Sequence, residues 1–157
     1  MRIEGESVAA AGDVLDLVIR PLVDPRSPFR ILVVEDEPVI RELVRSMLDD
    51  GPVEVETAGT GPEGLRLARG SRFDLVLLDV VLPGMDGLAV CRMLKADPAT
   101  AAVPLYMLTA KTRRSDLEAA LAAGANGYIH KPFRGSELME LVERLRTGEV
   151  EPGGAAS

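Results

Sequence analysis

Cysteine and histidine are nearly absent from this sequence of 157 residues, which contains one of each. With Cys91 as the only cysteine, no disulfide can form within the chain. Cys91 lies on an apolar helical face and is expected to fill space in the core. With His130 as the only histidine, metal sites built from several histidines are excluded.

Long apolar runs and an excess of positive charge are also missing. No run approaches the roughly 20 residues that span a bilayer, and the first residues are too acidic and polar for a secretory signal. The net charge of −7 and a pI near 4.8 argue against a nucleic-acid surface. We therefore expect a cytoplasmic protein with no membrane segment and no direct contact with nucleic acid.

The sequence does contain a regular alternation of short apolar runs and amphipathic helices. Strands are predicted at 31–34, 53–57, 73–78, 103–108 and 127–130. Helices are predicted after Pro38, after a capping box at Thr60–Glu63, over 86–96, from between Thr112 and Ser115 to Gly124, and around Leu138–Leu145. This alternation predicts an α/β fold, with five parallel strands covered on both faces by five helices.

The two ends of the chain have a different character from this repeating region at 29–147. Residues 1–28 are predicted to be an N-terminal extension, with apolar positions at roughly helical spacing interrupted by Pro21, Pro25 and Pro28. This extension either docks as a short helix or strand or stays mobile, and the sequence leaves both open. Residues 148–157 are rich in proline, glycine and alanine and are predicted to be a disordered tail.

Reactive side chains collect at the carboxyl ends of the predicted strands, where ligands bind in open α/β sheets. Glu35 and Asp36 follow the first strand, Asp79 the third, Thr109 the fourth and Lys131 the fifth. Clustered carboxylates repel one another unless a cation lies among them, and oxygen ligands favour Mg²⁺. A carboxylate can also act as a phosphoryl acceptor, while an ammonium and a hydroxyl bind phosphoryl oxygens. The residue types predict acceptance of a phosphoryl group by Asp79.

Four segments in this order resemble the receiver domains of two-component response regulators. They are Val33–Asp36, Leu77–Asp79 with Leu82–Gly87, Leu108–Ala110 and Lys131–Phe133, within a resemblance that runs from about Phe29 to Arg146. The resemblance implies a flavodoxin-like, doubly wound sheet with strand order 2-1-3-4-5. It also implies a signalling switch rather than an enzyme acting on other molecules.

The resemblance further implies a role for each residue of the acidic site. Asp36, Asp79 and the backbone carbonyl of Val81 would bind Mg²⁺, with Glu35 assisting through water. Asp79 would be the phosphoacceptor, with Thr109 and Lys131 as its catalytic partners. The Lys131–Pro132 peptide bond is expected to be cis.

A conformational switch and its partners follow from the same resemblance. Thr109 would move toward the phosphoryl group, and Tyr128 would turn inward to fill the space. The surface formed by the last two helices and the strand at 127–130 would then change shape, bind partners and support a homodimer. His130 matches no phosphodonor, so the phosphoryl group would come from a sensor histidine kinase or a phosphotransfer protein.

Two positions bear on the lifetime of the phosphorylated state. Val81 lies two residues after Asp79, and Lys111 two after Thr109. Neither side chain can accept a hydrogen bond from an attacking water, so self-dephosphorylation is predicted to be slow.

Three other functions compete with the phospho-switch. A haloacid-dehalogenase-type phosphotransferase would need a second carboxylate where Val81 stands. In a flavin module, acidic residues 35–37 would repel the flavin phosphate. A receiver-like interaction domain that is never phosphorylated would not need the complete set of site residues.

Overall fold

The computed structural model describes residues 27–111 and 113–148. The expected N-terminal extension, apart from its last two residues, lies outside the described part of the chain. So does the expected tail, apart from Gly148.

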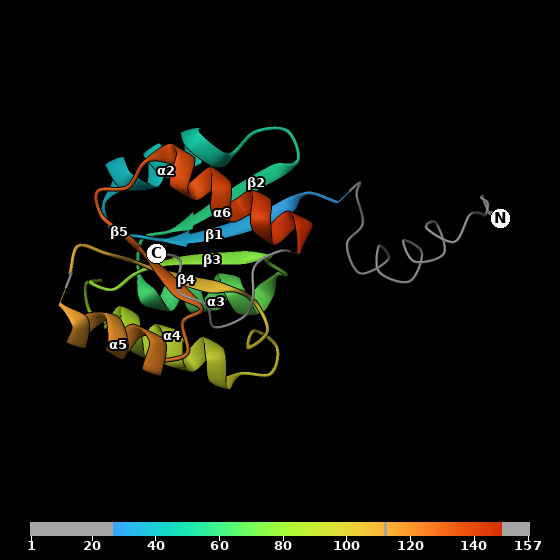
Figure 1. Ribbon diagram of the computed structural model, residues 1–157. Helices are drawn as coiled ribbons and strands as arrows, with labels where there is room; N and C mark the ends of the chain where they lie inside the picture. The colour runs from blue at the N-terminus through green and yellow to red at the C-terminus, as the bar shows by residue number, and fades with distance from the viewer. Residues whose placement is uncertain (1–26, 112, 149–157) are drawn as a thin grey trace.

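The described residues form a parallel sheet flanked by helices (Figure 1). Its strands are β1 (Phe29–Val34), β2 (Val53–Ala58), β3 (Leu75–Asp79), β4 (Leu105–Thr109) and β5 (Gly127–His130). All neighbouring pairs are parallel, and the strand order is β2-β1-β3-β4-β5. Within the described residues, the predicted flavodoxin-like order and the five-strand, five-helix count are confirmed.

The helices cover both faces of this sheet. They are α2 (Pro38–Leu48), α3 (Gly61–Gly70), α4 (Gly87–Ala96), α5 (Arg114–Ala122) and α6 (Gly135–Thr147). In Figure 1, α2 and α6 lie on one face, and α3, α4 and α5 lie on the other. The sheet therefore separates two hydrophobic cores.

Strand β1 shows why its sequence is continuously apolar rather than alternating. Ile31 and Val33 belong to the core beneath α2 and α6, whereas Leu32 and Val34 belong to the core on the opposite face. All four side chains are fully buried. A central parallel strand buries both of its faces, so every position is apolar.

Local capping follows the sequence closely at α3 and α4. The Thr60 hydroxyl accepts a hydrogen bond from the Glu63 N–H at 3.2 Å, and the Glu63 carboxylate accepts one from the Gly59 N–H at 2.9 Å. The Asp86 carboxylate accepts one from the Leu88 N–H at 3.1 Å. These contacts satisfy N–H groups that a helix start leaves without a partner.

The start of β4 differs from the prediction. The strand begins at Leu105 rather than Val103. The Val103 N–H donates to the Thr100 carbonyl at 3.1 Å in a turn, and Pro104 has no N–H to give a neighbouring strand. The apolar pattern identified the strand but not this turn.

Gly87 fixes how α4 leaves the sheet. Its N–H donates to the Val80 carbonyl at 2.9 Å. A Cβ atom at Gly87 would overlap the Asp79 carbonyl oxygen and lie 2.7 Å from that of Val80. Only a residue without a side chain allows this close approach of the helix start to the end of β3.

We expect Gly87→Ala to destabilise the fold by about 1–3 kcal/mol, because the backbone must shift to admit the methyl group. The matched control is Gly70→Ala, at a helical glycine where an added Cβ would meet no atom within 4 Å. Urea unfolding followed by circular dichroism measures both. Equal unfolding midpoints for the two variants would contradict this assignment.

Candidate functional site

The carboxyl ends of β1, β3 and β5 meet around one ammonium group. The Lys131 Nζ atom lies 2.6 Å from Glu35 Oε1 and 2.8 Å from Asp79 Oδ2. Glu35 is fully buried and Asp79 is 6% exposed. Two buried carboxylates predicted from separate strand ends therefore share one partly exposed cation.

Asp36 completes an acidic cluster. One carboxylate oxygen from each of Glu35, Asp36 and Asp79 lies within 4.8 Å of the others, and only Asp36 is exposed. Carboxylates this close repel one another, and hard oxygen donors are the ligands that Mg²⁺ prefers. The donor set fits a divalent cation.

Backbone N–H groups hold the two buried carboxylates in place. The Glu37 N–H donates to Glu35 Oε2 at 3.1 Å, and the Val81 N–H donates to Asp79 Oδ1 at 3.0 Å. Asp79 thus has one oxygen on a backbone N–H and the other on Lys131. This arrangement fixes the plane of the carboxylate at the mouth of the site.

Burial and hydrogen bonding shift the pKa values of two groups in the site. Burial raises the pKa of Glu35 to about 7, opposed by hydrogen bonds from Lys131 and the Glu37 N–H and reinforced by the nearby Asp79. Burial alone would lower the pKa of Lys131, but its hydrogen bonds to Asp79 and Glu35 outweigh that effect and raise it. At neutral pH Lys131 is therefore charged, and Glu35 is near the midpoint of its titration.

Thr109 and Tyr128 lie on the two strands beyond Asp79. Thr109 is buried at the end of β4, and its hydroxyl accepts a hydrogen bond from the Lys111 N–H at 2.9 Å. Asp79 pairs with Leu108 in the sheet, so Thr109 lies one residue further along. Tyr128 is half-buried on β5 and packs against the core on the α3–α5 face. In the described part of the chain, no hydrogen bond links Thr109 with Asp79.

The Lys131–Pro132 peptide bond is cis, as expected. Val81 follows Asp79 by two residues, and it is 61% exposed. Cys91 is fully buried on α4, as expected of a residue that fills the core.

Arg41 is a site residue that the sequence analysis missed. Its Nη1 atom donates to the carbonyl oxygens of Glu35 at 2.8 Å and Asp36 at 3.0 Å. A Cβ atom on Gly59 would lie 3.1 Å from the same nitrogen, so Gly59 leaves room for the guanidinium. The sequence did contain one indication of this role. Arg41 lies near the start of α2, where the helix dipole disfavours positive charge, so an arginine there suggests a specific contact.

The chain belongs to the response regulator receiver domain family, whose sequence profile matches residues 31–143. It is 45% identical over 124 residues to the DNA-binding response regulator MtrA of Mycolicibacterium smegmatis, covering 78% of this chain and 53% of that protein. The chain thus spans about half the length of the curated relatives it matches. The resemblance to receiver domains of two-component systems is confirmed.

Solved structures agree with this assignment. The chemotaxis protein CheY4 of Vibrio cholerae is 33% identical with a TM-score of 0.72, covering 76% of this chain and 99% of that one. The receiver domain of the sensor histidine kinase PA1611 of Pseudomonas aeruginosa is 34% identical with a TM-score of 0.71. The match covers 77% of this chain and 99% of that one. That domain is described with a magnesium ion coordinated in its active site cleft.

The expectation of no direct contact with nucleic acid is wrong for this class of protein, because the matched MtrA relatives are named DNA-binding response regulators. The expectation rested on the net charge of −7. Net charge is a sum over the 157 residues, whereas DNA contacts depend on local clusters of lysine and arginine. A negative sum therefore cannot exclude nucleic acid in a family of regulators.

Within residues 27–111 and 113–148, no helix is long and apolar enough to cross a membrane.

We expect Arg41→Gln to weaken Mg²⁺ binding by about tenfold, because the acidic turn loses the group that holds both of its carbonyls. Isothermal titration calorimetry with Mg²⁺ measures the affinity. Arg45→Gln is the matched control on the same helix, since Arg45 donates to Val55 and Thr57 instead. Equal affinities for the two variants would assign Arg41 no role at the site.

Proposed function

We propose that residues 29–147 form a receiver unit that accepts a phosphoryl group on Asp79 in a Mg²⁺-dependent reaction and acts as a switch. The observation that carries this proposal is the ammonium of Lys131, 2.8 Å from Asp79 Oδ2 beside two further carboxylates. A cation at that distance is placed to neutralise charge on a group transferred to Asp79.

The chemistry assigned to Asp79 is nucleophilic. One carboxylate oxygen attacks the phosphorus of a donor, an oxygen–phosphorus bond forms, and the bond from phosphorus to the donor breaks. The donor group leaves with the electron pair of that bond. The Val81 N–H keeps the carboxylate oriented. Lys131, which already contacts Asp79, and the Thr109 hydroxyl would donate hydrogen bonds to the phosphoryl oxygens.

A bound Mg²⁺ would supply positive charge to the carboxylates and to the phosphoryl oxygens. The residues that would hold it are Asp36, Asp79 and the Val81 carbonyl, with Glu35 assisting through water. The short distances among the three carboxylates support this set.

We infer the phosphoryl donor and the process that the switch controls from the protein family. Receiver domains of two-component systems take the phosphoryl group from a histidine kinase or a phosphotransfer protein. His130 is exposed at the end of β5, and we assign it no part in donating the phosphoryl group. Because MtrA is named a DNA-binding response regulator, we assign the switch to the control of DNA binding.

The switch itself would run through β4 and β5. We assign Thr109 a movement toward the phosphoryl group and Tyr128 an inward turn that changes the surface of α5, β5 and α6. The burial of Thr109 and the half-buried position of Tyr128 against the core support this pair.

Two competing functions are weaker. A haloacid-dehalogenase-type enzyme needs a general acid where the side chain of Val81 is exposed and apolar. An interaction domain without phosphorylation gives no reason for Glu35 and Asp79 to be buried side by side against Lys131, because burying charged groups is costly.

We expect incubation with acetyl phosphate and Mg²⁺ to add one phosphoryl group to the chain, measured as intact mass. EDTA and, separately, Asp79→Asn should each abolish the adduct, because one removes the cation and the other the nucleophile. Asp86→Asn is the matched control, since Asp86 lies on the same loop but caps α4. No adduct under any condition would favour the unphosphorylated interaction domain.

We expect the phosphorylated chain to lose its label slowly, over minutes or longer, because Val81 and Lys111 cannot orient a water. Val81→Asn should shorten the half-life several-fold by adding a side-chain amide beside the aspartyl phosphate. Quenched-flow sampling followed by mass spectrometry gives both rates. Loss of label within seconds from the unmodified chain, or equal half-lives for the two proteins, would overturn this prediction.

A further inference from the structure

A pocket of about 280 Å³ lies near the amino ends of β3 and β4, at the opposite end of the sheet from the acidic site. Its walls come from the ends of α3 and α4, the starts of the two strands and the loop that precedes β4. The apolar side chains that line it include Ala68, Phe73, Val76, Leu94, Val103 and Leu105.

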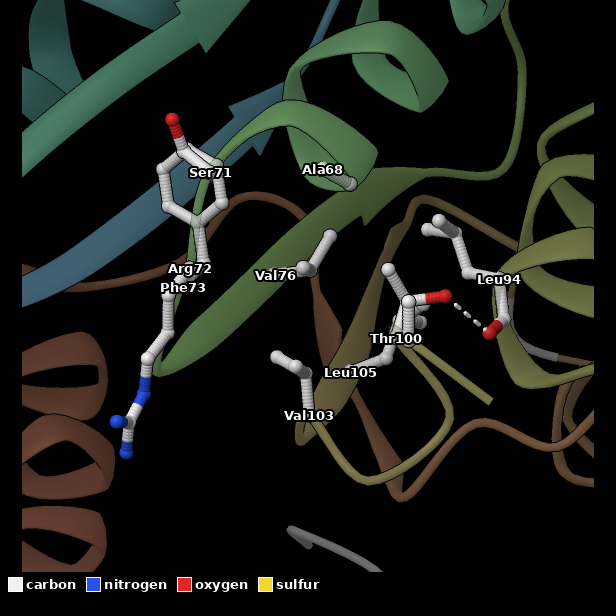
Figure 2. Close-up of a pocket in the computed structure, with 10 residues that line it drawn as sticks. Ala68, Ser71, Arg72, Phe73, Val76, Leu94, Thr100, Val103 and Leu105 are labelled. Atoms are coloured by element: carbon white, nitrogen blue, oxygen red, sulfur yellow. Dashed lines mark hydrogen bonds between the residues drawn. The ribbon is translucent and has the colours of Figure 1, made fainter. Parts of the chain in front are cut away.

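The lining favours an apolar occupant. Figure 2 shows the side chains of Val76, Val103 and Leu105 near one another, with the guanidinium of Arg72 extending away from them. The one buried hydroxyl, that of Thr100, already donates to the Leu94 carbonyl at 2.6 Å. The pocket therefore suits hydrocarbon side chains better than a charged metabolite.

The chain enters the sheet beside this pocket. Arg30, the second residue of β1, donates from Nη1 to the carbonyl of Arg72 at 2.8 Å. Its guanidinium lies 4.6 Å from the centre of the Phe73 ring. Residues that precede β1 therefore leave the sheet next to two residues that line the pocket.

The sequence upstream of β1 carries suitable side chains. Between positions 14 and 23 it contains Val14, Leu15, Leu17, Val18, Ile19, Leu22 and Val23. Six residues from Val23 to Phe29 can span up to about 20 Å, whereas β4 lies two strand spacings, about 10 Å, from β1. The tether is long enough for residues 14–23 to reach the pocket.

We propose that residues 14–23 of this chain dock into the pocket through their apolar side chains and cover the amino end of β3 and β4. Tethering favours this occupant over a free ligand, because a short linker holds the segment at an effective concentration in the millimolar range. The proposal is independent of phosphorylation and chooses docking over mobility for the N-terminal extension.

The first test uses amide chemical shifts of the full chain. Replacing Leu15, Leu17 and Leu22 together by Asp should move the amide signals of Val76, Leu94 and Leu105, because charged side chains would leave the pocket. Replacing Val8, Ala9 and Ala10 together by Asp is the matched control with the same change in charge. Unmoved pocket signals in the first variant, or equal movement in both, would overturn the proposal.

The second test approaches from the segment. The chain contains no tryptophan, so Leu17→Trp adds a single reporter. We expect acrylamide to quench it several-fold less than a free tryptophan amide, and Ala99→Arg to remove this protection by filling the mouth of the pocket. Ala102→Arg is the control, since Ala102 is also exposed on this loop but does not line the pocket.

Each outcome of this second test is decisive. Protection that survives Ala99→Arg would place the segment elsewhere, and full quenching of the reporter would mean that it is not docked. Protection that appears only as the protein concentration rises would assign the pocket to a second copy of the chain. Any of these results would overturn docking within one molecule.

Discussion

The contact of Lys131 with Glu35 and Asp79 is the interaction on which the rest of the structure depends. Two buried carboxylates cannot stay charged side by side without a cation, and an unpaired charge in the interior is costly. Lys131 is separated along the sequence by 96 residues from Glu35 and by 52 from Asp79. Only a sheet that places β1 next to β3, with β5 two strands beyond, brings the three groups together. The contact between these three groups therefore depends on the strand order.

The charges of the site also explain why it suits a divalent cation. Three ionised carboxylates beside one ammonium leave two negative charges, which equals the charge that one Mg²⁺ neutralises. In the metal-free protein part of that excess is relieved by a proton, because burial raises the pKa of Glu35 to about 7. The site thus holds an excess of negative charge that a bound divalent cation would neutralise. Arg41 and the Val81 N–H hold the acidic turn and the Asp79 carboxylate in position meanwhile.

Periodic and positional signals in the sequence predicted the layers and the convergence of five polar residues at one edge of the sheet, whereas the strand order was implied by the resemblance to receiver domains. Apolar runs marked strands buried on both faces, and parallel strands bring Glu35, Asp36, Asp79, Thr109 and Lys131 to one edge. The contact of Arg41 could not be read, since its acceptors are backbone carbonyls that no residue type marks. The start of β4 was misplaced because apolar Val103 lies in a turn before Pro104. Net charge misled the prediction about nucleic acid, because it describes a sum rather than a surface.

The two ends of the sheet are joined by the same elements. Strand β3 carries Val76 in the pocket and Asp79 at the acidic site, three residues apart. Helix α4 begins against the backbone of Asp79 at Gly87 and ends near the pocket after Leu94. A segment docked at one end and a phosphoryl group at the other would therefore act on one strand and one helix. Any coupling between the two sites must be reciprocal. If docking changes the equilibrium free energy of phosphorylation, phosphorylation changes the free energy of docking by the same amount.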